Sequence, residues 1–392
     1  MATLLLLIIY IAFISLGLPD AMLGAAWPVM QADFAMPYSF AGVISMTISG
    51  GTIVSSIFSS RVLRRYGIGK VTAGSVGLTS VALLGFGLAP SLWWIILLAL
   101  PLGIGAGAVD AGLNTFVAGH YESRHMSWLH SFWGLGALTG PLVLSALFAR
   151  GISWRSGYLS IAAFQALLVV MLVFSIPLWN KVRRRGVMEG ESKETLHRPL
   201  LYPLGLKGAK IALLAFLCYC GLEASMGLWG GSFLFRIKGL EPSRAAVWVS
   251  LFYASLTAGR FITGFLSYKV ANRDLIRYGS LVILAGILLV LLPLPLPASL
   301  AGFLVIGLGC APIYPCMLHE TPSRFGADNA SSIMGFQMAV AYIGSTFLPP
   351  AFGFIASVAS LALLPVFLMA YVACMIAASE LLQKNLSRAS PT

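Results

Sequence analysis

Apolar runs recur along almost the whole chain, and each is long enough to cross a lipid bilayer. A membrane-spanning helix needs about 20 predominantly apolar residues, and the sequence holds twelve such segments among its 392 residues. Hydrophobic residues make up 58% of the chain and charged residues only 10%, a composition unlike that of a soluble domain. The first run has no small-residue cleavage site, which indicates a retained span and not a signal peptide. The sequence therefore predicts an all-α membrane protein.

The polar segment 180–208 is the longest interruption, and it divides the spans into six and six. We expect an N-terminal six-helix bundle at 1–180, a cytoplasmic linker at 181–208 and a C-terminal six-helix bundle at 209–392. The predicted spans are 4–31, 39–60, 70–89, 92–118, 127–149, 155–179, 209–235, 243–267, 275–293, 298–319, 329–355 and 359–382.

The basic residues cluster in short loops, which is typical of membrane topology and not of nucleic-acid binding. With the N-terminus inside, nineteen of the 25 lysines and arginines fall in inside segments and five in outside segments. This bias predicts that both termini and the central loop are cytoplasmic, in the plasma (inner) membrane. The run Arg183–Arg185 is interpreted as a topology determinant, with contact to anionic membrane lipids as a minor addition.

The two halves repeat each other at a nearly constant offset. Asp20-Ala-Met-Leu-Gly24 reappears 203 residues later as Glu223-Ala-Ser-Met-Gly227. Two further pairs share an offset of 204: Gly103-Ile-Gly105 with Gly307-Leu-Gly309, and Phe132 and Gly140 with Phe336 and Gly344. Parallel repeats of this kind, related by an axis along the membrane normal, occur in secondary transporters, whose substrate site lies between the repeats near the midplane. The sequence thus predicts two pseudo-symmetric bundles.

The twelve spans, the basic central loop and the basic segment Arg61-Val-Leu-Arg-Arg-Tyr-Gly-Ile-Gly-Lys70 together resemble the major facilitator superfamily. Within it, Leu16-Gly-Leu-Pro-Asp20-Ala-Met-Leu-Gly24 and an acid-bearing span 4 resemble the fucose permease branch of sugar–proton symporters. In that branch one acid on span 1 and one on span 4 are essential for substrate and proton handling. The resemblance implies that these roles fall on Asp20 and Asp110. The branch has a glutamate in span 4, and the aspartate here is shorter by one methylene.

Asp110 lies in the glycine-rich apolar segment 103–114. Burying a carboxylate there costs free energy, which indicates a functional role. Burial disfavours the ionised form, so we expect Asp110 to bind and release a coupling proton. Asn114 lies four residues on and shares its helix face. Gly103 and Gly107 have the same spacing and offer a small-residue strip for close helix packing. The alternative is a structural acid paired with a neighbouring helix.

Asp20 follows Pro19, which bends a span and is tolerated where the helix lines a cavity. We expect its carboxylate to accept hydrogen bonds from substrate hydroxyls or to act as a second proton site; the alternative is an acid that fixes the bend. His130 could relay protons from Asp110, because histidine titrates near neutral pH, with Trp133 on the same face. A histidine that caps or packs at a helix start is the other interpretation.

In the second half, Glu223 is the repeat counterpart of Asp20. It could bind substrate, bind a cation together with exposed carbonyls, or make an interdomain bond that closes one face. Arg260 lies about two turns inside span 8, where a guanidinium needs a partner, and we expect it to make a gate contact with an acid or helix-end carbonyls. Aromatic and amide side chains suit a neutral polar solute, and about half of this set should line a cavity: Trp229, Tyr253, Tyr314, Gln337 and Tyr342. Asn114 and Trp133 are candidate substrate contacts in the first half.

Other chemistry has no signature in the sequence. There is no phosphate-binding loop, which argues against ATP-driven transport, and the glycines of span 4 lack the strand that a dinucleotide site needs. No metal or nucleophile constellation is present, and the five cysteines are expected to be buried structural residues. We therefore expect no enzyme activity and no cofactor. The expected partners are a small-molecule solute and membrane lipids, and a monomer is sufficient.

These observations favour a proton-coupled symporter of a sugar or similar small polar solute that works by alternating access. Sodium remains open as the coupling ion, since carboxylates and freed carbonyls suit both cations. Two alternatives remain: a drug–proton antiporter that exports amphipathic cations, and a non-transporting membrane receptor.

Overall fold

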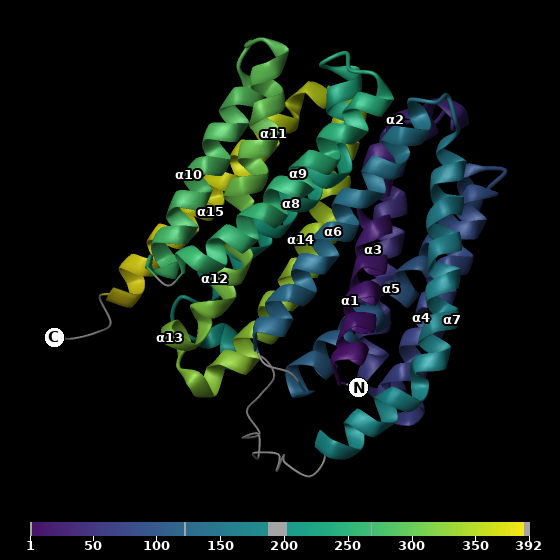
Figure 1. The fold of residues 1–392 in the computed structure, drawn as a ribbon. Coiled ribbons are helices and arrows are strands. Elements are labelled where there is room, and N and C mark those ends of the chain that lie inside the picture. Colours follow the sequence, from purple (N-terminus) through teal and green to yellow (C-terminus); the bar gives the residue numbers. More distant parts are fainter. Residues whose placement is uncertain (1, 121–122, 187–201, 268, 388–392) are drawn as a thin grey trace. The chain divides into compact units, whose positions relative to one another are not determined.

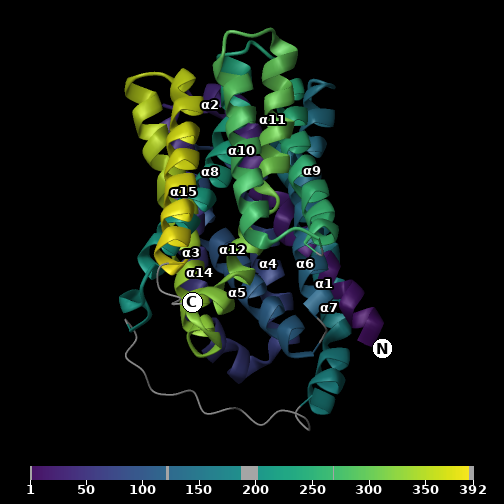
Figure 2. The ribbon, with the colours of Figure 1, turned by 90° about the vertical axis from the view of Figure 1, so that its left-hand side faces the viewer.

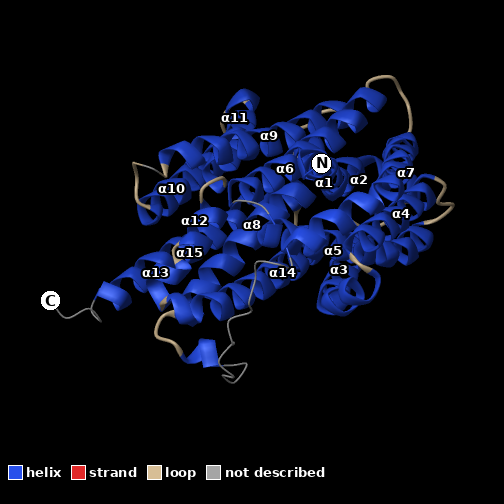
Figure 3. Ribbon diagram, turned by 60° about the horizontal axis from the view of Figure 1, so that its bottom comes forward, coloured by secondary structure: helices blue, strands red, loops and turns tan. Residues whose placement is uncertain are grey.

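The fold is entirely helical in the part of the chain that the computed structural model describes, residues 2–120, 123–186, 202–267 and 269–387 (Figure 3). Within these residues, twelve helical segments are long and apolar enough to cross a membrane. This confirms the predicted fold class and the number of spans. Residues 187–201, which make up most of the predicted linker at 181–208, lie outside the described residues.

The first half of the chain forms seven helices, shown in purple to teal in Figure 1. They are α1 (Ala2–Asp20), α2 (Met22–Phe34), α3 (Ser39–Tyr66), α4 (Ile68–Gly87), α5 (Leu92–His120), α6 (Ser123–Phe148) and α7 (Trp154–Gly186).

The second half forms eight α-helices and two short 3₁₀ turns. They are η1 (Tyr202–Gly205), α8 (Ala209–Arg236), α9 (Pro242–Leu266), α10 (Asn272–Leu291), α11 (Leu296–Cys310), α12 (Ile313–His319), α13 (Thr321–Phe325), α14 (Ala327–Val358), η2 (Leu361–Leu363) and α15 (Leu364–Ser387).

The helices gather into two compact units. One contains α1 to α7 with the start of α9 (Gly239–Ser250), and the other contains α8, the rest of α9 and α10 to α15. In the first unit α3 packs on α5, α4 on α5 and α7, and α1 on α6, around a core that includes Phe13, Phe116 and Trp179. In the second unit α8 packs on α14 and α15, and α10 packs on α11 and α15 (Figure 2).

Glycine lets the helices of the first unit approach closely. A Cβ atom at Gly103 would overlap the carbonyl oxygen of Ile48, and one at Gly107 would overlap that of Thr52. The Thr52 hydroxyl donates to the Gly103 carbonyl oxygen at 3.2 Å, which links α3 directly to α5. The predicted small-residue strip on span 4 is therefore confirmed. Close packing of this kind is a main source of helix association in lipid, where apolar burial between helices contributes little.

Two spans are interrupted inside the membrane-crossing length. The prediction placed 4–31 and 298–319 in one span each, but the structure divides the first at Ala21 and the second at Ala311–Pro312. Pro312 explains the second break, since it lacks the N–H that would continue the helical ladder. Pro19 lies inside α1, two residues before the first break, and leaves the Ser15 carbonyl oxygen to accept from Gln165. Such irregular backbone at membrane depth is tolerated where it is buried in protein or lines a water-filled cavity. Asp20 and Cys310 are the last helical residues before the two breaks.

Candidate functional site

Asp20 stands at the break between α1 and α2, and its side chain is exposed. The indole Nε1–H of Trp133, on α6, donates to Asp20 Oδ2 at 2.7 Å. The structure thus joins two of the residues predicted from the sequence. Gly17 and Gly136 allow this approach, because a Cβ atom at either position would overlap the backbone of the facing helix. The donor to Asp20 is neutral, and among the described residues no cation lies within ion-pair distance of this carboxylate.

Asp110 and Asn114 lie on one face of α5, as their spacing predicted. The Asn114 amide Nδ2 donates to Asp110 Oδ1 at 2.8 Å and to the Asp110 carbonyl oxygen at 3.0 Å. Both side chains are half-buried. The Asp110 carboxylate also repels that of Asp20 electrostatically. The two acids of the first unit are therefore close enough for the charge on one to act on the other.

His130 lies near the start of α6 and packs edge-on against Phe13 of α1, with ring centroids 6.0 Å apart. This contact agrees with its interpretation as a packing histidine and does not test its proposed role as a proton relay. A second histidine was missed by the sequence analysis. The Tyr10 hydroxyl and His125 Nδ1 are hydrogen-bonded at 2.8 Å, and Tyr10 also stacks on Phe132. No sequence signal joins these residues, since 115 positions separate Tyr10 from His125.

Glu223 and Arg260 form an ion pair inside the second unit. Arg260 Nη2 lies 3.7 Å from Glu223 Oε1, and the two side chains are 17% and 16% exposed. The expectation that Arg260 has an acid partner is confirmed, whereas its role as a gate stays a prediction. Tyr219, one helical turn before Glu223 on α8, donates its hydroxyl to Glu223 Oε2. Sequence reasoning missed Tyr219, although the four-residue spacing could have identified it.

The remaining candidates of the second unit lie in different surroundings. Trp229 is fully buried and donates Nε1–H to the Pro349 carbonyl oxygen at 2.8 Å, and Gln337 is buried and accepts from the Thr321 hydroxyl at 2.9 Å. Tyr253 is buried with its hydroxyl against Gly227.

Tyr314 and Tyr342 are half-buried. The Tyr314 hydroxyl contacts Met338 Sδ at 3.3 Å, and its ring packs on Phe216. Tyr314 also interacts electrostatically with Arg260. The structure thus brings Tyr314, a member of the predicted aromatic and amide set, close to the Glu223–Arg260 pair.

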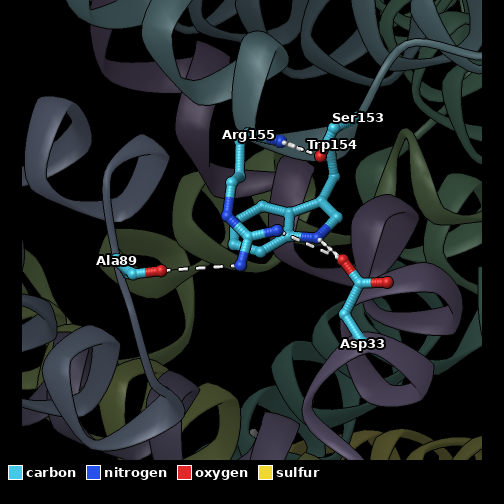
Figure 4. Close-up of polar contacts among 5 residues, drawn as sticks. All are labelled: Asp33, Ala89, Ser153, Trp154 and Arg155. Atoms are coloured by element: carbon cyan, nitrogen blue, oxygen red, sulfur yellow. Dashed lines mark hydrogen bonds and ion pairs between the residues drawn. The ribbon is translucent and has the colours of Figure 1, made fainter.

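A further polar cluster of the first unit lies where α2 ends and α7 begins. Trp154 Nε1 and Arg155 Nη1 donate to Asp33 Oδ2 at 2.7 and 3.2 Å (Figure 4). Arg155 Nη2 also reaches the Ala89 carbonyl oxygen at 3.5 Å, and the guanidinium lies over the Trp154 ring. This cluster ties the end of α2 to the start of α7 and to the turn between α4 and α5. All of these bonds are made within the first unit.

No group of three histidine, cysteine, aspartate or glutamate side chains could hold a metal ion among the residues that the structure describes. What the arrangement offers is carboxylates and hydrogen bonds inside helices that are long and apolar enough to cross a membrane. Such groups on twelve spans in two helical bundles are typical of a membrane transporter.

Comparison with known proteins identifies the family. The sequence profile of the Major Facilitator Superfamily matches residues 9–349, so the chain belongs to this superfamily. It is 26% identical to an uncharacterized MFS-type transporter of Yersinia pestis over 370 residues, which cover 90% of this chain and 88% of that protein. It is 24% identical to the glucose/mannose transporter GlcP of Bacillus subtilis over 324 residues, 79% and 77% of the two chains.

Solved structures show the same fold at low sequence identity. A bacterial homologue of the human lysosomal transporter Spinster, in an inward-facing and unoccupied conformation, aligns with a TM-score of 0.81 at 15% identity, covering 100% of this chain and 99% of the other. The nucleoside transporter NupG aligns with a TM-score of 0.75 at 14% identity, covering 97% and 98%. The superfamily part of the sequence resemblance is confirmed, and the chain is an integral membrane transporter by family and by its spans.

Proposed function

We propose that this transporter is a proton-coupled symporter of a sugar or similar small polar solute, working by alternating access. The observation that carries the proposal is the presence of two acids in the first unit, Asp20 and Asp110, on two membrane-spanning helices. Both accept hydrogen bonds from neutral donors, Trp133 and Asn114. Acids placed in this way at membrane depth mark substrate and proton pathways.

In the proposed cycle, Asp110 takes up the coupling proton and Asp20 accepts hydrogen bonds from solute hydroxyls. Protonation of Asp110 removes its repulsion on Asp20 and the cost of moving a charge through the membrane interior, which lets the two bundles rock with the solute bound. Release of the proton on the cytoplasmic side restores the repulsion and favours release of the solute. Asn114 and Trp133 hold the two carboxylates in place, and His130 would relay the proton.

The sugar assignment has two supports. The first is the similarity to GlcP, whose name gives glucose and mannose as its solutes. The second is the resemblance of span 1 to the fucose permease branch, which we retain as part of the proposal. We also propose that both termini are cytoplasmic, from the distribution of basic residues, and that a monomer is the working unit.

Proton movement in proteoliposomes tests the proposal. Adding the transported monosaccharide should make the external medium more alkaline, and Asp110→Asn should abolish this signal. Asp274→Asn is the matched control, because Asp274 lies at the start of α10 beside Arg273, outside the acid pair.

Three other outcomes would contradict the proposal. Symport that survives unchanged in Asp110→Asn would remove Asp110 from the proton path, and solute-driven movement of sodium without protons would replace the coupling ion. Silence with every sugar, together with proton release on adding cationic drugs, would favour the antiporter.

A further inference from the structure

The Tyr219 hydroxyl lies between two acceptors that belong to different helices. It donates to Glu223 Oε2 on its own helix α8, and it lies 3.1 Å from the carbonyl oxygen of Cys310 on α11. A tyrosine hydroxyl carries one proton and can donate only one strong hydrogen bond at a time. The two contacts therefore compete whenever Glu223 is ionised.

The Cys310 carbonyl is a special acceptor, because Cys310 is the last residue of α11 before the break at Ala311–Pro312. The final carbonyl groups of a helix have no partner within the helix and need one from elsewhere. A hydrogen bond from Tyr219 is thus a cap on the interrupted span. Cys310 is completely buried, so bulk water does not replace this partner.

We propose that Tyr219 is a positioning residue that transmits the protonation of Glu223 to the break between α11 and α12. With Glu223 ionised, the Tyr219 hydroxyl donates to the carboxylate, and the Cys310 carbonyl loses its cap. When Glu223 takes a proton from the aqueous phase, its own O–H donates to the Tyr219 oxygen, and Tyr219 turns its proton to the Cys310 carbonyl. Loss of the proton to water reverses both bonds. The Cys310 carbonyl at the break in span 10 is therefore hydrogen-bonded when Glu223 is neutral and lacks this bond when Glu223 is charged.

The groups around Glu223 fit such a switch. Arg260 of α9 pairs with the ionised form and loses this attraction when Glu223 is neutral. Among the described residues, the titratable groups with an electrostatic contact to the cluster include Cys220 of α8, Cys310 of α11 and Tyr314 of α12, besides Tyr219 itself. The Glu223 side chain keeps 16% of its surface exposed.

This switch adds a proton-responsive group in the second unit to the proton coupling proposed above, and only its use in transport rests on that function. Amide hydrogen exchange of residues 308–316, measured in the full-length protein in nanodiscs, tests the switch itself. After correction for intrinsic rates, exchange should be about five-fold slower in acidic than in alkaline buffer, the effect of gaining one hydrogen bond. Glu223→Gln should be slow in both buffers and Tyr219→Phe fast in both. The double variant should behave as Tyr219→Phe, because without the hydroxyl the state of residue 223 has no route to Cys310.

The matched control is Tyr158→Phe, in α7, whose buried hydroxyl has no hydrogen-bond partner among the described residues. It should keep the pH-dependent exchange of residues 308–316. Size-exclusion chromatography shows whether each variant is folded, and Tyr219→Phe decides the outcome should Glu223→Gln fail to fold. A pH-dependent exchange that persists in Tyr219→Phe would overturn the switch, and so would exchange that is equal at both pH values in the unaltered protein.

Transport measurements separate the two proposals. If symport fails while the exchange pattern stands, the proposed function is wrong and the switch remains. If symport is shown but the exchange pattern is absent, the switch is wrong and the function remains. With both in place, Tyr219→Phe should flatten the pH dependence of solute uptake, whereas a merely structural role would lower uptake equally at every pH.

Discussion

Asp20 and Glu223 occupy equivalent positions of the two repeats, yet their surroundings differ in charge. Asp20 lies at a helix break, is exposed and accepts from the neutral indole of Trp133. Glu223 lies within the continuous helix α8, is mostly buried and pairs with Arg260. The first acid can gain or lose a proton without breaking an ion pair, whereas the second cannot. The two repeats therefore place an acid at the same position in surroundings of different charge.

The two repeats also differ in which of their spans is interrupted. Span 1 is broken in the first unit and its counterpart α8 is continuous; span 4 forms the continuous helix α5 and its counterpart is broken into α11 and α12. At the offset of 204 residues, Asp110 of α5 corresponds to Tyr314 of α12. The first unit thus concentrates acids in span 1 and span 4, and the second concentrates an ion pair and tyrosines around its break. This asymmetry agrees with the proposal that Asp110 of the first unit takes up the proton and Asp20 accepts hydrogen bonds from the solute.

The largest expected effect concerns the two acids. Glu223→Gln should lower the free energy of unfolding by about 2 kcal/mol, because it leaves the Arg260 guanidinium without its counter-charge in a poorly solvated place; partial exposure keeps the loss below that of a fully buried pair. Asp20→Asn should change stability by under about 0.5 kcal/mol, since the amide oxygen still accepts from Trp133 and no cation is stranded. Thermal unfolding in detergent compares them. The double variant Glu223→Gln/Arg260→Gln should recover most of the loss, and equal effects of the two single variants would contradict the contrast.

Much of this architecture was accessible from the sequence, for reasons that are local. Hydropathy predicts each span, because the thickness of the bilayer fixes the length of a membrane-crossing helix. The four-residue spacing of Gly103 and Gly107 predicts the small-residue strip for close helix packing. The Asp110–Asn114 bond follows in the same way from one helix face. That Arg260 needs a partner was also predictable, because a guanidinium at membrane depth cannot stay unsatisfied.

The partners that arise from tertiary packing could not be predicted. Asp33 and Arg155 are 122 residues apart and meet only because α2, α7 and the α4–α5 turn end together. Trp229 resembled a cavity-lining aromatic by its depth in the span, but which face of α8 is covered depends on α14. The breaks in spans 1 and 10 had a proline signal. The contact of Tyr219 with the Cys310 carbonyl oxygen at the second break could not be predicted, because 91 residues separate the two.

A comparison of two indole donors, Trp133 of the first unit and Trp229 of the second, tests the same contrast with smaller effects. Trp133→Phe should raise the KM for the solute about ten-fold, equivalent to about 1.4 kcal/mol, because Asp20 loses the hydrogen bond that orients its carboxylate. Trp229→Phe should leave the KM unchanged and lower the free energy of unfolding by about 1 kcal/mol, since it strands the buried Pro349 carbonyl. Uptake kinetics and thermal unfolding on both variants give the comparison. A raised KM in Trp229→Phe would place that indole on the solute path and weaken the assignment of solute binding to the first unit.

The smallest effect is expected at the exposed ion pair between Asp33 and Arg155, whose side chains are 40% and 35% exposed. Asp33→Asn should lower the free energy of unfolding by about 0.5 kcal/mol or less, because solvent screens the pair and the amide oxygen still accepts from Trp154. The loss should shrink further in high salt. Glu223→Gln, measured in parallel, should show little dependence on salt, because its charge pair is largely shielded from ions. A large, salt-independent loss in Asp33→Asn would show that this cluster, and not the Glu223–Arg260 pair, is the stronger ionic tie in the molecule.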